Sequence, residues 1–360
     1  MPSKVYYIET KTSDTVDAVA EKFRLLIDKS GILKFIKKDD FTGIKMHFGE
    51  EGNTGHVRYE WVKELSGRLS TITKNAFVVD SNVLYKNSKR ANSIDHIKTA
   101  SDHGFDLARI GVPLIIAGGI FGRNYADVEI KKRHFAKVKI ASDIAECDSL
   151  VALTHFTGHM MTCVGGAIKN LGMGCASRRG KYEQHSGVVP EVNIKFCIGC
   201  GLCVKECPAS CIKLVGGHAR IAKESCIGCG ECVVTCRTKA IDIKWSEKLD
   251  NLQEKMVEYA YGAVSVLKGR IGYISFLIKV TKDCDCLAKD EPRIVEDAGI
   301  LASLDPVSID KAAIDILTAR GKTDVFKKSN PGTSWLRQLE YAQELGMGSL
   351  DYKLENVGND

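Results

Sequence analysis

The amino-acid sequence predicts an α/β fold: a mostly parallel sheet with helices on both faces, interrupted by an inserted cysteine-rich module. Three observations support this class. Apolar runs of strand length alternate with helical patterns along most of the chain. Most of these runs are apolar on both faces, which is typical of parallel strands that helices cover on both sides. The alternation stops near residue 190 and resumes after residue 245, which indicates an insertion.

The first 175 residues supply most of the expected strands. Residues 4–9 form the first strand, and a helix over residues 15–28 follows, with Gly31 as its stop. Residues 43–48 form the second strand, before a helix over residues 59–69. Further strands are expected at residues 76–80, 113–118, 137–141 and 150–156.

The pattern after residue 245 completes the same domain. The expected elements are a helix at 250–268, strands at 271–280 and 298–305, and helices at 309–318 and 334–345. Two strands in about 115 residues would make a thin core for a separate domain. We therefore expect one α/β domain built from residues 1–189 and 246–360, with residues 190–245 inserted.

Composition and charge exclude several classes of protein. Of the 360 residues, 44% are hydrophobic and 27% are charged, close to the soluble globular average. No apolar run reaches about 18 residues, so no membrane span is expected. The first residues lack a signal-peptide core, which favours a cytoplasmic protein. The net charge of +6 is modest and the basic clusters are short, which favours solvated loops or an acidic docking partner over nucleic acid.

Cysteine is the unusual residue of this composition, with fourteen in the chain. A disulfide scaffold is disfavoured, because cytosolic thiols stay reduced. Eight cysteines between Cys197 and Cys236 repeat the spacing C-x2-C-x2-C-x3-C. This spacing is that of bacterial two-cluster ferredoxins, so we expect a ferredoxin-like module with two [4Fe-4S] clusters. The alternatives are a disulfide knot and two zinc sites, although zinc sites do not need the fourth cysteine of each run.

The spacing also predicts which cysteines share a cluster. Three thiolates of each run can wrap one cubane, while a helical turn directs the fourth cysteine toward the other cluster. One cluster is expected on Cys197, Cys200, Cys203 and Cys236, and the other on Cys226, Cys229, Cys232 and Cys207.

Six cysteines lie outside this pattern. Cys211 is expected to be a small buried side chain. Cys284 and Cys286 form a C-x-C pair, and on an extended segment both thiols would point to the same side. With Cys175 or Cys163 they would bind a further metal. The alternative is that Cys284 and Cys286 are two buried thiols near the clusters.

Polar residues collect where the expected strands end. Because the carboxyl ends of parallel strands meet at one edge of a sheet, where α/β proteins bind ligands, these side chains are expected to line a pocket. Taken singly, Asp80 could equally be a helix N-cap and His47 a core histidine. The catalytic candidates are His47, Glu50, Asp80, Asn82, His155, His159 and Lys169.

A glycine-rich turn follows His159. Gly165 and Gly166, just before a short helix, could present backbone amides to an anion, with Lys169 facing it. Tight packing of the helix on the sheet explains the glycines equally well. The turn lacks the GxGxxG and GK[ST] patterns, so it does not indicate a nucleotide site.

Taken together, the sequence resembles the uncharacterised iron–sulfur centre proteins, domain of unknown function 362. The similarity lies in the segments KMHFGEEGN, DSNVLYK, HFTGH, GGAIKNLGMGCASRRGK, KDCDC and ILASLDPVSIDKAAID. It covers residues 4–355 and implies an α/β core with an inserted two-cluster ferredoxin module. The chain departs from the family pattern at Thr157, where a lysine is usual. The resemblance implies no reaction.

Three functions compete at this point. The first is a redox protein whose clusters relay single electrons to or from a small-molecule substrate or second cofactor in the pocket, with a histidine moving the proton. The second is an electron carrier whose α/β domain docks a redox partner protein. The third is a metal or cluster assembly factor that uses Cys175, Cys284 and Cys286. No flavin, nicotinamide or haem motif is present.

Overall fold

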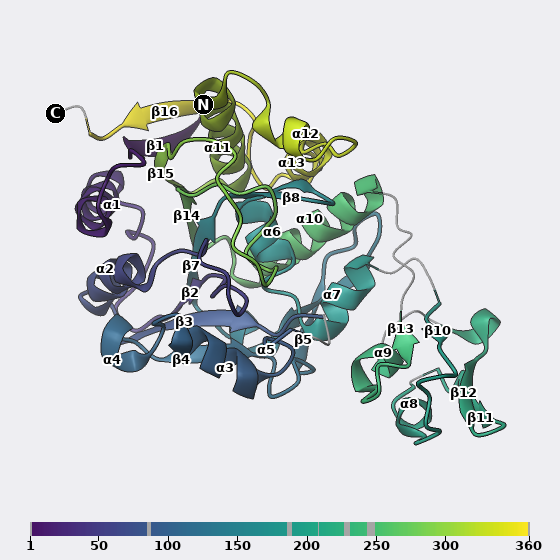
Figure 1. Ribbon diagram of the computed structural model, residues 1–360. Coiled ribbons are helices and arrows are strands. Elements are labelled where there is room, and N and C mark those ends of the chain that lie inside the picture. Colours follow the sequence, from purple (N-terminus) through teal and green to yellow (C-terminus); the bar gives the residue numbers. More distant parts are fainter. Residues whose placement is uncertain are drawn as a thin grey trace.

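The computed structural model describes residues 2–84, 88–185, 189–207, 209–226, 231–242 and 249–358. Its centre is an eight-stranded sheet in the order β16-β1-β15-β14-β7-β2-β3-β4 (Figure 1). Every strand of this sheet runs in the same direction except β15. The strands are β1 (Ser3–Glu9), β2 (Phe41–Lys45), β3 (Asn75–Ser81), β4 (Leu114–Ala117), β7 (Ser149–His155), β14 (Ile271–Leu277), β15 (Gly299–Ser303) and β16 (Tyr352–Asn356). The predicted α/β fold with a mostly parallel sheet is confirmed.

Helices cover both faces of the sheet (Figure 1). Successive residues of β7 alternate between two buried clusters, with Leu150 in one and Val151 in the other, as the two-residue period of a strand requires. The first face carries α1 (Val16–Ser30), α2 (Tyr59–Ser70), α3 (Ser93–Asp102) and α4 (Leu107–Ile110). The second carries α6 (Ala167–Gly172), α10 (Leu249–Val266), α11 (Pro306–Gly321), α12 (Val325–Ser329) and α13 (Leu336–Glu344). No helix of the described residues is long and apolar enough to cross a membrane.

Strands β6 and β16 differ from the sequence-based expectation in an instructive way. The strand expected at residues 137–141 is β6 (Lys137–Ala141), which pairs with β5 (Tyr125–Glu129) outside the main sheet. Its lysines alternate with apolar residues, so only one of its faces is apolar, unlike the central strands. Strand β16 was not expected, because its sequence YKLEN is polar; it is an edge strand held by pairing with β1. Short α5 (Ser142–Ala145) follows β6.

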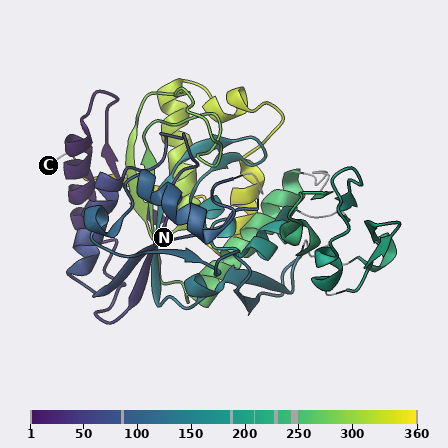
Figure 2. The ribbon, with the colours of Figure 1, turned by 60° about the horizontal axis from the view of Figure 1, so that its bottom comes forward.

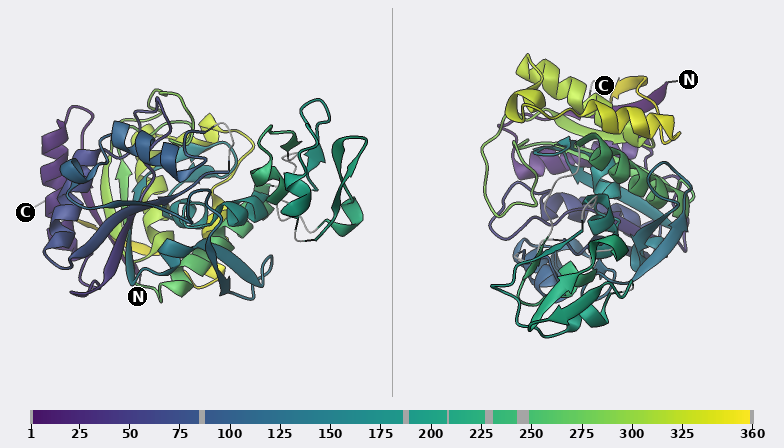
Figure 3. Two further views of the ribbon diagram at one scale, coloured as in Figure 1. Left: turned by 90° about the horizontal axis from the view of Figure 1, so that it is seen from below. Right: turned by 90° about the vertical axis from the view of Figure 1, so that its right-hand side faces the viewer.

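The cysteine-rich segment forms a small unit with its own buried cluster at one end of the molecule (Figures 1, 2 and 3). It contains two antiparallel pairs of strands, β10 with β13 and β11 with β12. Leu84 and Tyr182 of the α/β domain belong to the same buried cluster. The elements of this unit are β10 (Glu191–Val192), α8 (Leu202–Lys205), β11 (Ile212–Val215), β12 (His218–Ile221), η1 (Lys223–Ser225), α9 (Glu231–Thr235) and β13 (Ile241–Asp242).

Candidate functional site

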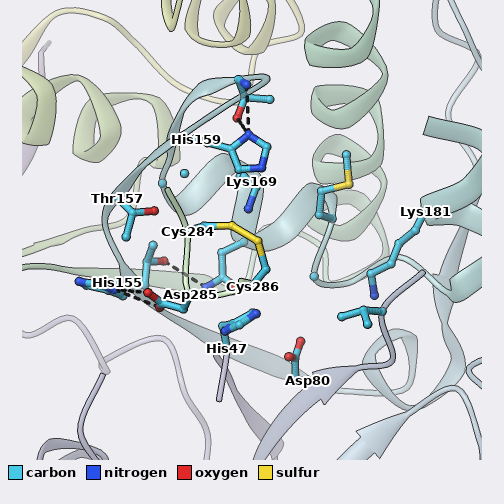
Figure 4. A pocket seen from close by; sticks show the side chains of 18 of the residues that line it. His47, Asp80, His155, Thr157, His159, Lys169, Lys181, Cys284, Asp285 and Cys286 are labelled. Carbon is cyan, nitrogen blue, oxygen red and sulfur yellow. Dashed lines mark hydrogen bonds and ion pairs between the residues drawn. A yellow bond between two sulfur atoms is a disulfide. The ribbon is translucent and has the colours of Figure 1, made fainter. Parts of the chain in front are cut away.

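A cavity of about 140 Å³ lies where β2, β3 and β7 end (Figure 4). These strands are parallel neighbours, so their carboxyl ends reach the same edge of the sheet. The hairpin of β8 (Thr157–His159) and β9 (Cys163–Gly165) adds a second wall. Besides Cys284 and Cys286, seven residues that the sequence singled out line the cavity: His47, Asp80, His155, His159, Gly165, Gly166 and Lys169.

Glu50 and Asn82, expected in this pocket, do not line it. The Asn82 amide is fully buried and donates to the Ser93 hydroxyl (3.0 Å), so it holds loops together. The Glu50 carboxylate accepts a hydrogen bond from Arg90 Nε at 3.2 Å, and both side chains are buried. Arg90 does line the cavity, so the Glu50 side chain acts on the site through Arg90.

His155 lines the cavity but is fully engaged. Its Nδ1 lies 2.8 Å from a carboxylate oxygen of Asp285, and its Nε2 lies 2.7 Å from the carbonyl oxygen of Ile278. Both ring nitrogens therefore face acceptors, which requires a protonated ring. Burial opposes the charge, but the Asp285 carboxylate outweighs it and raises the pKa of His155 above 6.5. His155 is thus a poor general base; its role is to hold Asp285.

This ion pair predicts a pH dependence of stability. A histidine whose pKa is raised on folding stabilises the protein below its unfolded pKa, and this stabilisation is lost as pH rises through the folded pKa. We expect the free energy of unfolding to fall more steeply above pH 6.5 in the wild type than in Asp285→Asn. Urea denaturation across about pH 6 to 8 measures both slopes. Parallel slopes would contradict a charged His155.

Asp80 is the centre of a buried charge cluster. Its Oδ1 lies 3.0 Å from Lys45 Nζ, and both side chains are almost completely buried. Burial opposes ionisation, but the charges of Lys45, His96 and Lys181 lower the pKa of Asp80 overall. Lys181 Nζ also donates to the carbonyl oxygen of Asn82 at 2.8 Å. The carboxylate is therefore neutralised within the wall of the cavity.

His47 and His159 present N–H donors to the cavity. His47 Nδ1 accepts from the amide of Gly49 at 3.0 Å, and His159 Nδ1 accepts from the amides of Met161 and Thr162, both at 3.2 Å. Backbone amides can only donate, so we assign the proton of each neutral ring to Nε2. The Thr162 hydroxyl, 3.0 Å from His159 Nδ1, can direct its proton to that nitrogen or to the carbonyl oxygen of Val164. Burial lowers the pKa of both histidines well below 6.5, which keeps the rings neutral. The buried Nε2 of His47 has no hydrogen-bond partner among the described residues.

Lys169 supplies the positive charge of this donor set. Burial lowers its pKa to about 8, so it is mostly protonated at neutral pH. Among the described residues its ammonium group makes no hydrogen bond or ion pair of its own. With His47 and His159 it gives the cavity three unengaged donors, which suit an acceptor-rich, anionic occupant.

The two amides that directly follow Gly165 and Gly166 are not free for an external anion. The amides of Ala167 and Ile168, at the start of α6, donate to the carboxylate of Asp310 at 2.7 and 3.0 Å. A Cβ on Gly166 would lie 2.3 Å from Asp310 Oδ1, so the glycine permits this close approach. Lys169, the charged residue of the expected anion site, lines the cavity. Gly166 permits the close packing of α6 against Asp310.

Cys284 and Cys286 line the cavity and are joined by a disulfide. A ring nitrogen of His159 and the two sulfur atoms lie within 4.8 Å of one another. Cys175, the expected third metal ligand, is fully buried in the core beside α6 and does not line the cavity. Cys163 likewise points elsewhere, toward Thr333. Among the described residues, the candidate ligand that lies beside the C-x-C pair is thus His159.

Among the expected cluster ligands, thiols of the two runs come together. Burial and the nearby thiols of Cys236, Cys197 and Cys200 raise the pKa of Cys203. Cys203 therefore has one neighbour from the second run and two from its own. The amide of Ala219 donates to Cys197 Sγ at 3.3 Å.

A second group of thiols surrounds Cys211. Its sulfur lies 3.4 Å from Cys207 Sγ, and burial together with Cys207 and Cys226 raises its pKa to about 12. Cys211 is buried, as expected. Cys232 is buried in the cluster of this unit, and Cys229 lies outside the described residues.

Sequence reasoning missed four charged residues of the cavity wall: Lys45, Arg90, Lys181 and Asp285. Lys45 had a usable signal, because it lies two residues before His47 and alternate residues of an extended segment share a face. Lys181 lies on α7 (Arg178–His185), whose polar sequence RRGKYEQH gives no apolar stripe. Asp285 lies between Cys284 and Cys286, and nothing near it in the sequence indicates its partner His155.

Comparisons with known proteins give a family and a weak structural similarity. No curated protein matches this chain. The lactate racemase apoprotein from Thermoanaerobacterium thermosaccharolyticum shares 10% identity at a TM-score of 0.41, over 77% of this chain and 51% of that one. A structural-genomics protein from Thermotoga maritima shares 10% identity at a TM-score of 0.41, over 94% of this chain and 61% of that one. This chain thus spans 51% and 61% of the lengths of these structures.

The family model described as "Domain of unknown function (DUF362)" matches residues 42–315, which include the cavity-lining residues and the cysteine-rich unit. This match covers more than half of the chain. The protein therefore belongs to the DUF362 family.

Proposed function

We propose that this protein is a redox protein in which two [4Fe-4S] clusters exchange single electrons with an anionic substrate or second cofactor in the cavity. One observation is the main support for the proposal: a residue that lines the cavity also belongs to the buried cluster of the cysteine-rich unit. Leu84 lines the cavity and also belongs to the buried cluster that contains Cys203 and Cys232. On α7, Lys181 faces the cavity while Tyr182 belongs to the cluster of the cysteine-rich unit.

The cysteines fit the clusters in donor type and grouping. Cubane clusters take thiolate ligands, and the neighbours of Cys203 are Cys236, Cys197 and Cys200, the set that crossed ligation needs. The proximity of Cys226 to the Cys207 and Cys211 pair supports the second set. A cubane would supply one-electron transfer at low potential.

The residues of the cavity would bind and orient the occupant. Lys169, His47 and His159 would donate to its acceptor atoms, because their donors are unengaged within the part of the chain that the structure describes. Lys169, with a pKa of about 8, can also release or return a proton near neutral pH, which electron transfer to an organic group commonly requires.

Two features bear on the partners of the reaction. Ile194, Phe196 and Ile198 are exposed beside Cys197, and exposed apolar side chains in a group favour docking of a partner protein. The cavity favours relay over a dedicated electron carrier, because a carrier needs no cavity lined by charged side chains behind its clusters.

The proposed function is tested by metal, sulfide and flavin determination on anaerobically purified protein, followed by a redox titration monitored by electron paramagnetic resonance. We expect two cubane signals that appear only at low potential, because ligation by cysteine alone gives no upward shift of the kind histidine ligands cause. Protein that holds two zinc ions and shows no paramagnetic signal on reduction would contradict the proposal.

A further inference from the structure

We propose that Cys284 and Cys286 form a redox-active pair, which undergoes thiol–disulfide exchange with a small anionic thiol held in the cavity. The two sulfur atoms form a disulfide, and both residues line the cavity and are partly exposed (Figure 4). A molecule in the cavity can therefore reach the sulfur atoms. The other four cysteines outside the two runs, Cys147, Cys163, Cys175 and Cys211, are buried and do not line the cavity.

The backbone holds the pair in place whether or not the sulfurs are bonded. The amide of Glu50 donates to the carbonyl oxygen of Asp285 at 2.9 Å, and the Asp285 carboxylate is fixed by His155. The amide of Gly158 donates to the carbonyl oxygen of Thr281 at 2.9 Å, just before the pair. Since these anchors do not involve sulfur, reduction would leave the two thiols close together.

The hydrogen bonds of His159 favour this chemistry over a metal site. An imidazole that binds a metal through one nitrogen donates its other N–H to an acceptor. His159 has the opposite arrangement, because its Nδ1 accepts from the two backbone amides described above. In Figure 4 the His159 ring lies beside the disulfide with Nδ1 turned away, toward Thr162. Its Nε2–H therefore lies on the side of the ring toward the disulfide, whose sulfur atoms lie within 4.8 Å of a ring nitrogen.

The charged groups that line the cavity determine which small thiol can bind there. Lys169 and His47 offer unengaged donors to a carboxylate, while Asp80 and Asp285 are already paired with Lys45 and His155. A nearby cation also stabilises the thiolate that leaves during exchange, which makes the pair more reactive. A small thiol that carries a carboxylate fits both requirements.

The exchange balances without any other reactant. The thiolate of a first small thiol attacks one sulfur atom of the disulfide, the S–S bond breaks, and the other cysteine leaves as a thiolate and takes up a proton. A second small thiol attacks the mixed disulfide and releases the small disulfide. The protein gains two thiols, and two small thiols become one disulfide. In the reverse direction the reduced pair reduces a small anionic disulfide.

This step connects to the proposed function but is tested apart from it. If the clusters deliver electrons, the cysteine pair can store two electrons together with two protons. Only this link between the clusters and the pair rests on the proposed function. Reduction by added thiols needs no cluster. Iron content, measured on the same samples, separates failure of one idea from failure of the other.

The experiment compares three thiols of different charge as reductants of the intact protein: 3-mercaptopropionate, 2-mercaptoethanol and cysteamine. Alkylation and mass spectrometry of the peptide that contains Cys284 and Cys286 follow the reaction, and each rate is corrected for the thiolate fraction. We expect 3-mercaptopropionate to react about tenfold faster than cysteamine, as one nearby positive charge allows. The variant Lys169→Gln should remove this preference, whereas Lys98→Gln, at an exposed lysine of α3, should keep it.

Equal corrected rates for the three thiols in the wild type would overturn the proposal, whatever the variants do. So would one tightly held zinc ion per chain that is lost in Cys284→Ser but kept in Cys163→Ser, since that pattern indicates a metal site. Charge-selective reduction in protein without iron would support the pair and count against the relay.

Discussion

Replacing Cys236 with alanine is expected to halve the iron content of anaerobically prepared protein, from about eight to about four atoms per chain. The reason is that each cubane needs its four thiolates, and the thiol of Cys236 lies near Cys203 of the first run. The cluster that disappears should therefore be the one held by Cys197, Cys200 and Cys203. Iron and sulfide determination, with paramagnetic resonance of the remaining cluster, measures the effect.

Two companion variants make this test specific. Cys207→Ala should remove the other cluster, so the two variants should retain different paramagnetic signals. Cys163→Ala, at a buried cysteine outside both runs, should keep all the iron. If Cys236→Ala and Cys207→Ala lose the same signal, or each loses the cluster of its own run, the crossed ligation is wrong.

Replacing Asp80 with alanine is expected to lower the free energy of unfolding by about 3–5 kcal/mol, the cost of leaving a buried charge without its partner. Lys45 lies 3.0 Å from Asp80 and is as deeply buried, and the charge of Lys181 also acts on this carboxylate. The Lys45 ammonium group would stay buried in the wall of the cavity without its partner. Urea denaturation of the wild type and the variant gives the difference.

The matched control is Asp290→Ala. Asp290 also forms an ion pair, with Lys279 at 2.6 Å, but its side chain is 55% exposed. Its loss should cost less than about 1 kcal/mol, as is usual for surface pairs. If Asp80→Ala lowers the free energy of unfolding no more than Asp290→Ala does, Asp80 and Lys45 do not form a charged pair.

The order of apolar segments was enough to predict the core of the fold. Strands such as β7 and β14 are apolar on both faces, and this pattern reflects their burial directly. Strand β16 could not be predicted, since it is polar and depends on pairing with β1, far away in the sequence. For the same reason the sequence predicts β6 as a strand but does not predict its pairing with β5 outside the main sheet.

The position of the candidate site in the fold could be predicted from the sequence. Which of its side chains lack hydrogen-bond partners could not. Strand ends placed His47, Asp80 and His155 at one edge correctly, because parallel strands share that edge. Whether a side chain is engaged depends on partners distant in sequence. His155 is bound by Asp285, 130 residues away, and the amide of Ala167 by Asp310, 143 residues away. Such pairs leave no local signal in the sequence.

The central claim is that electrons pass between the cysteine-rich unit and the cavity. Its most direct test is to reduce the protein anaerobically with a one-electron photoreductant that does not react with disulfides. The thiols of Cys284 and Cys286 are then counted by alkylation as the reduced-cluster signal decays. Relay predicts that two new thiols appear in the wild type as the signal is lost, and that none appear in the double variant Cys207→Ala, Cys236→Ala. In protein whose disulfide the added small thiols do reduce, clusters that stay reduced beside an intact disulfide would contradict the relay.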